Sequence, residues 1–202
     1  QDANGVIWIS TWNNGINKFR EESNDFKRFV HDNKVPTSIS HNKIRTMYED
    51  SFGNFWLASF GGGLLKFDSK TERFIEFAQN NPNVPNSVQN VIWSLFQDRS
   101  GILWVGSFGT GIYLYDIHKH KFPLYRALPN AEHTLSSNAI SSIYEDHKGI
   151  LWVGTNGAGL NSWNRVTGEI NHYLSFHDEP AGMIREVAED SKKRLWVGTD
   201  DG

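Results

Sequence analysis

One motif recurs along the chain at a nearly constant spacing, and this repeat constrains the fold more than any other feature. One copy reads Gly-Ile-Leu-Trp-Val-Gly-Thr over residues 149–155, and every copy centres on a tryptophan: Trp8, Trp56, Trp104, Trp152 and Trp196. Successive tryptophans are 48, 48, 48 and 44 residues apart. A fixed period of this size indicates a repeat architecture, in which each repeat is one supersecondary unit that buries its apolar surface against its neighbours.

A turn signal precedes the tryptophan in each repeat. An aspartate stands six residues before it in all five copies, and a glycine stands three residues before it in four, with Lys193 in the fifth. Asp-x-x-Gly is typical of a type I turn, with the aspartate capping the turn through its own backbone. A catalytic carboxylate is the alternative interpretation, and five identical copies argue against it. The aspartates are Asp2, Asp50, Asp98, Asp146 and Asp190.

Each repeat contains four short runs of β-prone residues, which we term strands A to D. Strand A precedes the turn, strand B contains the tryptophan, strand C follows a glycine-rich loop, and strand D follows a polar turn. We expect strand A at 44–49, 92–97, 140–145 and 184–189, strand C at 16–19, 64–67, 112–115 and 160–163, and strand D at 26–29, 74–77, 122–125 and 170–173. The longer D–A linker leads to the next repeat.

Four short strands per repeat with no helical periodicity predict an all-β protein, a β-propeller with four-stranded antiparallel blades of about 48 residues. We expect residues 1–202 to form one propeller segment with about four blades. A larger ring is the preferred interpretation, and closure of this chain into four blades is the alternative. The expected divisions are a partial blade at 1–38, blades at 39–86, 87–134 and 135–180, and a partial blade at 181–202.

Composition excludes several classes of function. The net charge of −3 provides no basic field for nucleic acid or an anionic membrane. The chain has no cysteine, no apolar run near the roughly 20 residues of a membrane helix, no nucleophile elbow and no phosphate-binding loop. His118 and His120 lie in a C–D turn without a carboxylate cluster, so we expect no metal site and no cofactor.

The repeats resemble the two-component regulator propeller repeats found in the sensor regions of Bacteroides-type hybrid two-component histidine kinases. Ile140, Ile143, Asp146, Gly149, Leu151 to Thr155, Gly159 and Leu160 fit the pattern of that family. Ala58 in place of glycine and Trp163-Asn164 in place of an aromatic-Asp pair depart from it.

The resemblance implies a non-catalytic segment of a periplasmic sensor region that belongs to an inner-membrane histidine kinase. It also implies a seven-bladed ring, completed by further blades of the same chain. The family senses oligosaccharides and regulates polysaccharide utilisation, and it usually works as a homodimer. The ligand implied for this chain is therefore an oligosaccharide.

Positions that differ between repeats are the candidates for a binding site, since positions that are the same in every repeat serve the common scaffold. In an up-and-down sheet the B–C loops and D–A linkers lie at one end, where sites are usually built. Two positions there vary, four residues after and eleven residues before the tryptophan, and they supply the candidate ligand-binding residues Trp12, Phe60, Phe108 and Asn156, and Arg45, Trp93 and Arg185.

Aromatic rings suit the apolar faces of sugars, and arginines suit an acidic sugar. The alternative interpretation is that the first set covers the top of the ring and the second lines its channel. Asn42, Asn90 and Asn138, fourteen residues before the tryptophan, are interpreted as turn-forming residues.

Two other functions remain open. A propeller glycoside hydrolase or polysaccharide lyase would need paired acids, and Glu132 and Glu186 are the candidates near this end without forming an obvious pair. A protein-interaction propeller would use the exposed aromatic residues as hot spots.

Overall fold

The computed structural model describes residues 1–77, 91–116, 123–129, 131, 133–173, 175–176, 179–180 and 182–200. All regular elements in these ranges are β-strands. The chain divides into two compact units, residues 1–92 and 93–202, which are described separately. In the part of the chain that the structure describes, no helix is long and apolar enough to cross a bilayer.

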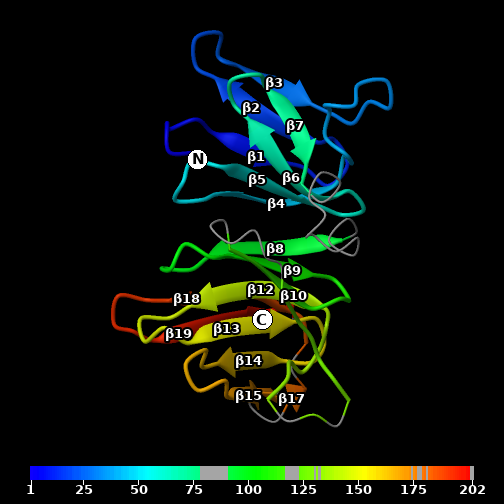
Figure 1. The fold of residues 1–202 in the computed structure, drawn as a ribbon. Helices are drawn as coiled ribbons and strands as arrows, with labels where there is room; N and C mark the ends of the chain where they lie inside the picture. The colour runs from blue at the N-terminus through cyan, green and yellow to red at the C-terminus, as the bar shows by residue number, and fades with distance from the viewer. Residues whose placement is uncertain are drawn as a thin grey trace. The chain divides into compact units, whose positions relative to one another are not determined.

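Residues 1–92 contain two antiparallel sheets (Figure 1). The first is three-stranded, in the order β1-β2-β3, and the second is four-stranded, in the order β4-β5-β6-β7. Their bounds are Trp8–Ser10 (β1), Ile16–Arg20 (β2), Asp25–Phe29 (β3), Ile44–Glu49 (β4), Phe55–Ser59 (β5), Gly63–Asp68 (β6) and Arg73–Glu76 (β7).

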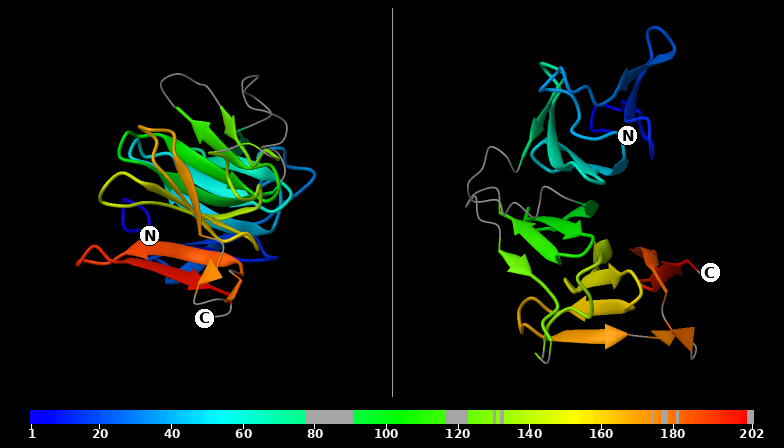
Figure 2. Two further views of the ribbon diagram at one scale, coloured as in Figure 1. Left: turned by 90° about the horizontal axis from the view of Figure 1, so that it is seen from below. Right: turned by 90° about the vertical axis from the view of Figure 1, so that its right-hand side faces the viewer.

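Residues 93–202 contain two further four-stranded antiparallel sheets and two pairs of strands. Figure 2 shows β12 to β15 as neighbouring ribbons, from yellow to orange. The strands are Ile92–Gln97 (β8, which begins at the boundary), Leu103–Ser107 (β9), Ile112–Tyr115 (β10), Leu124–Tyr125 (β11), Ile140–Glu145 (β12), Leu151–Thr155 (β13), Leu160–Trp163 (β14), Ile170–Tyr173 (β15), Ser175–Phe176 (β16), Glu179–Pro180 (β17), Ile184–Glu189 (β18) and Leu195–Thr199 (β19).

The predicted all-β architecture of four-stranded antiparallel blades is confirmed. The four predicted A strands coincide with β4, β8, β12 and β18 residue for residue. The short hairpin of β16 and β17 was not predicted, because it falls in the last D–A linker, where the repeat pattern is weakest. Of the predicted strand at 122–125, residue 122 lies outside the described residues. The blade boundaries and the seven-bladed ring stay predictions.

The repeated aspartate does more than cap its turn. In Asp50, Oδ1 accepts hydrogen bonds from the backbone N–H groups of Phe52 and Asn54, at 3.0 and 2.8 Å, and Oδ2 accepts one from Trp56 Nε1 at 2.8 Å. The aspartate-to-tryptophan bond recurs in the other four repeats at 2.9–3.0 Å. Asp50 is 6% and Trp56 1% exposed, so the bond satisfies the polar atoms of two buried side chains.

Neighbouring sheets pack through the aromatic residues that recur at fixed phase. In residues 1–92, Trp8 of β1 contacts Phe67 of β6 edge to face, with ring centroids 5.1 Å apart. In residues 93–202, Trp104 of β9 contacts Trp163 of β14 in the same way at 5.5 Å. These two anchor tryptophans thus meet the aromatic residue that ends strand C of the next sheet, as expected for core packing between blades.

Strand A also carries a polar link to the preceding sheet. The last residue of β4, Glu49, accepts a hydrogen bond from the backbone N–H of Ala3, and Glu145 of β12 accepts one from Arg99. Glu189 of β18 accepts one from the N–H of His147 at 3.1 Å, and its Oε2 lies 2.7 Å from His147 Nδ1. In each case the donor is the residue that follows the turn aspartate of the preceding repeat.

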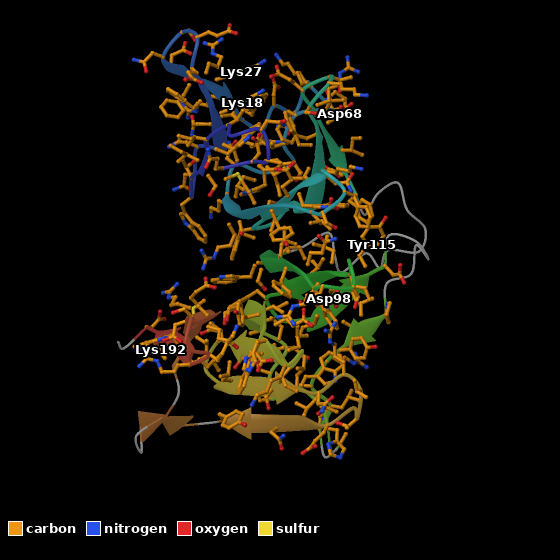
Figure 3. All side chains as sticks on the ribbon, turned by 90° about the vertical axis from the view of Figure 1, so that its left-hand side faces the viewer. Lys18, Lys27, Asp68, Asp98, Tyr115 and Lys192 are labelled. Carbon is orange, nitrogen blue, oxygen red and sulfur yellow. The ribbon has the colours of Figure 1, made fainter. Side chains whose placement is uncertain are left out.

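The C–D turns add ion pairs between sheets at the same end of the molecule. Lys18 of β2 and Lys27 of β3 lie opposite each other (Figure 3). Both bind Glu72 in the C–D turn of the next sheet. Arg165, in the C–D turn after β14, binds Asp98 and Glu145 and lies over the Trp104 ring, 5.4 Å from its centroid. These pairs link sheets through partly buried groups.

Asp50→Ala is predicted to lower the free energy of unfolding by about 3 kcal/mol, because it leaves two backbone N–H groups and a buried indole N–H without their acceptor. Urea unfolding followed by fluorescence measures the change. The control is Asp68→Ala, which removes turn bonds to Lys70 and Thr71 but touches no tryptophan, and should change the value by less than about 1 kcal/mol. Equal losses in the two variants would contradict a special role for the aspartate-to-tryptophan bond.

Gly111→Ala is predicted to destabilise the chain by about 3 kcal/mol, because its φ is +102° and a Cβ there would lie 2.3 Å from the carbonyl oxygen of Tyr125. Gly109, in the same loop, has φ of +118° but open space around its Cβ position. Gly109→Ala therefore tests backbone strain alone and should cost about 1 kcal/mol. Equal melting temperatures for the two variants would contradict the prediction that the contact with Tyr125 adds to the backbone strain.

Acid should weaken the link at Glu189. The hydrogen bond from His147 is the main cause that lowers the pKa of Glu189 from 4.5 to about 2. The resulting stabilisation is complete above the unfolded value, near pH 4.5, and is lost as the pH falls towards 2. Glu189→Gln should therefore flatten the pH dependence of unfolding in this window, whereas Glu186→Gln, at an exposed position of the same strand, should leave it unchanged. Identical profiles for the two variants would contradict the prediction.

Candidate functional site

The B–C loops are fixed to the next repeat by backbone pairing. Phe60, four residues after Trp56, forms an isolated β-bridge with Val91, and the equivalent Phe108 and Asn156 pair with Ala139 and Met183. In each bridge the second residue directly precedes strand A of the following repeat. The backbone at the predicted position is therefore the same in three repeats, while its side chain differs.

The recurring asparagines join separate segments at this end. Asn42 accepts a bond from the N–H of Gly15 on its carbonyl and one from the N–H of His31 on its side chain. Asn138 does the same, with Gly109 and Gly111 on its carbonyl and Ala127 on Oδ1 at 2.7 Å. Their role is to connect the loop and linker of the preceding repeat, and not to form a local turn as predicted. Asn90 lies outside the described residues.

Trp12 and Phe60 form an aromatic pair with a cation beside it. Their ring centroids are 5.5 Å apart, with an angle of 54° between the planes, and half of the Trp12 surface is exposed. The ammonium of Lys43 lies 5.8 Å from the Trp12 centroid and 5.5 Å from the Phe60 centroid. Both distances lie within the range of a cation–π interaction. We call Trp12, Lys43 and Phe60 the Lys43 cluster.

His41 stands next to this cluster. Its Nδ1 accepts a hydrogen bond from the backbone N–H of Lys43 at 3.1 Å, which assigns the ring proton to Nε2. Burial, followed by the nearby charges of Lys43 and His31, lowers the pKa of His41 below its ordinary value of 6.5. The imidazole is therefore neutral at pH 7, and the positive charge of the cluster comes from Lys43.

A second aromatic pair occurs in residues 93–202. Trp93 of β8 and Phe108 of the following B–C loop stack with ring centroids 4.6 Å apart and 29° between the planes. Phe108 is 38% exposed. The sequence analysis had selected both residues by position alone, and the structure brings them together into one apolar platform.

The remaining candidates do not join these pairs. Arg185 of β18 forms an ion pair with Asp200 in the next B–C loop, so its charge is already neutralised. Asn156 is exposed at the end of β13. Arg45 lies near the start of β4 and is partly buried. The ligand role of all seven candidates stays a prediction.

Sequence reasoning missed Lys43, although a signal for it was present. The position thirteen residues before the tryptophan reads Lys43, Val91, Ala139 and Met183, so it varies between repeats. It also lies in the D–A linker, at the end where variation was expected to mark function.

Within the described ranges, no group of three or more His, Asp or Glu side chains is placed to hold a metal ion. Glu186 is exposed on β18, while Glu132, His118 and His120 lie outside the described residues.

Antiparallel four-stranded sheets in repeats of this length define a β-propeller. Four segments of the chain, residues 38–61, 86–109, 134–157 and 178–201, match the family described as two component regulator propeller. The chain belongs to this family. Each matched segment ends one residue after Phe60 or its equivalents Phe108, Asn156 and Asp200. No curated protein sequence matches the chain.

Three solved structures illustrate the fold. The extracellular domain of a putative hybrid two component system from B. thetaiotaomicron aligns with a TM-score of 0.79 and 24% identity, covering 98% of this chain and 28% of that one. A second such domain from B. thetaiotaomicron aligns with a TM-score of 0.69 and 18% identity, covering 96% and 30%. Virginiamycin B lyase from Staphylococcus aureus aligns with a TM-score of 0.69 and 17% identity, covering 98% and 61%.

At these identities the similarity establishes the fold and no more. The chain spans less than a third of the length of these two extracellular domains. A sensor region and an enzyme share the architecture, so the fold alone does not decide between them.

Proposed function

We propose that the chain is a non-catalytic segment of the periplasmic sensor region of a hybrid two-component histidine kinase, and that it binds an oligosaccharide. The membership of the regulator propeller family supports the signalling role, and the similar extracellular domains support a location outside the cytoplasm. The complete protein would be anchored in the inner membrane, would work as a homodimer, and would regulate genes for polysaccharide utilisation.

The observation that carries the ligand proposal is the pair of partly exposed aromatic platforms at the end of the B–C loops. Trp12, Phe60 and Phe108 occupy the same position of three repeats, four residues after the tryptophan, and Trp93 of β8 stacks on Phe108. Backbone bridges fix the loop at Phe60 and at Phe108. Exposed rings on a rigid scaffold suit the apolar faces of sugar rings, and loop amides supply partners for hydroxyl groups. Ligand contacts there would favour one of two arrangements of the dimer, and so transmit the signal.

An enzyme is the second candidate, because a lyase shares the fold. A glycosidase would require two carboxyl groups on either side of the scissile bond. The described loops at this end of residues 1–92 offer no such pair, since Asp32 accepts the N–H of Lys34 in its own turn. The sensor is therefore the better-supported proposal.

Trp12→Ala and Trp93→Ala are predicted to weaken oligosaccharide binding about tenfold each, a loss of about 1.4 kcal/mol, because each removes one ring of a platform. Calorimetry with a panel of plant and host glycans, with product analysis of the same mixtures, measures affinity and turnover. Saturable binding without cleavage is expected.

The matched control is Phe26→Ala. Phe26 pairs with Phe19 at 5.2 Å and 54°, nearly the geometry of Trp12 and Phe60, but at the opposite end of the sheet. Its loss should not change affinity. Cleavage of a glycan would establish the enzyme instead, and binding that is equally weakened by all three variants would remove the site from the B–C loops.

A further inference from the structure

The Lys43 cluster contains a positive charge that forms no ion pair with any of the described residues. Trp12, Lys43 and Phe60 form a triangle whose three separations all lie between 5.5 and 5.8 Å. Among the described residues, Lys43 Nζ has contacts with these two rings and no ion pair. An ammonium held over two rings keeps its charge and lacks a carboxylate partner.

The charged groups of residues 1–77 are distributed unevenly between the two ends of the sheets. The A–B and C–D turns hold most of the carboxylates: Asp2, Glu21, Glu22, Asp25, Asp50, Asp68 and Glu72. In the described part of the opposite end, the linker over 30–43 carries Lys34 and Lys43 with Asp32, and Glu76 ends β7. Asp32 accepts the N–H of Lys34 in its own turn.

The cluster is also open to solvent on one side. Half of the Trp12 surface is exposed, although tryptophans at the anchor positions of the neighbouring sheets are almost completely buried. The Lys43 ammonium lies over the rings, and the exposed indole surface is available to a ring-shaped ligand. His41 presents a neutral N–H donor beside the cluster, since its Nδ1 accepts the N–H of Lys43.

From this arrangement we propose that the Lys43 cluster is a subsite for an anionic sugar, in which Trp12 stacks on the pyranose ring and Lys43 binds its carboxylate or sulfate group. This inference rests on the proposed function and narrows its ligand to acidic oligosaccharides. Lys43 is the residue that selects charge.

Matched glycan pairs test the inference on the 202-residue chain. Oligogalacturonides are compared with their methyl esters, and sulfated chondroitin disaccharides with their desulfated forms, by calorimetry at 50 and 500 mM NaCl. We expect the anionic member of at least one pair to bind about tenfold more tightly at low salt, with a smaller difference at high salt. The glycan pair whose two members bind with different affinities shows whether the subsite recognises a carboxylate or a sulfate.

Lys43→Gln removes the charge while keeping most of the side chain, and should abolish the preference without changing affinity for the neutral member. Lys43→Arg keeps the positive charge and should therefore retain the preference for the anionic member. Lys66→Gln is the control, because Lys66 also lies over a ring, 5.9 Å from the centroid of Trp56, but within strand β6.

Three results would overturn the inference. Equal binding of charged and neutral members, or an unchanged preference in Lys43→Gln, would leave the oligosaccharide sensor standing without an anionic subsite. Binding of no glycan in the whole panel would reject both the inference and the proposed function.

Discussion

A hydrogen bond from the indole N–H of the anchor tryptophan to the turn aspartate recurs in all five repeats, and the packing of the scaffold depends on it. It connects the turn between strands A and B to the residue at the centre of strand B, six positions away. The tryptophan can then bury its large ring between sheets, because its polar atom already has a partner. Loss of the aspartate would therefore affect both the turn and the packing of the next sheet.

The links between sheets are concentrated at the end of the molecule that carries these turns. There the last glutamate of strand A reaches the preceding turn, and Glu72 and Arg165 bridge neighbouring sheets. At the other end the contacts between repeats are made by backbone bridges and by the asparagines. Most other side chains at that end are thus not needed to connect the repeats. They can therefore differ between repeats and form local groups such as the Lys43 cluster.

The repeat pattern predicted the strands well because a fixed period sets the phase of every element, and four A strands were placed residue for residue. It could not show the aspartate-to-tryptophan bond, since a turn cap explained the aspartate without reference to a side chain six positions away. The sequence also could not show that the charge of Arg185 is neutralised, because its partner Asp200 comes from a different segment. Lys43 was not predicted, although its position varies between repeats as that of a site residue should, because its neighbours Trp12 and Phe60 come from other segments of the chain.

Gly111 shows what the close approach of strands at the variable end means for the evolution of the loops. Its Cβ position is taken by the carbonyl oxygen of Tyr125, and Gly15 meets Phe29 in the same way. These two B–C loops therefore return to their sheets through an equivalent fixed point. A loop whose two ends are held in the same way can be exchanged between repeats as a unit. Recombination between repeats of one gene would then shuffle the ligand-facing residues around the propeller without disturbing its core.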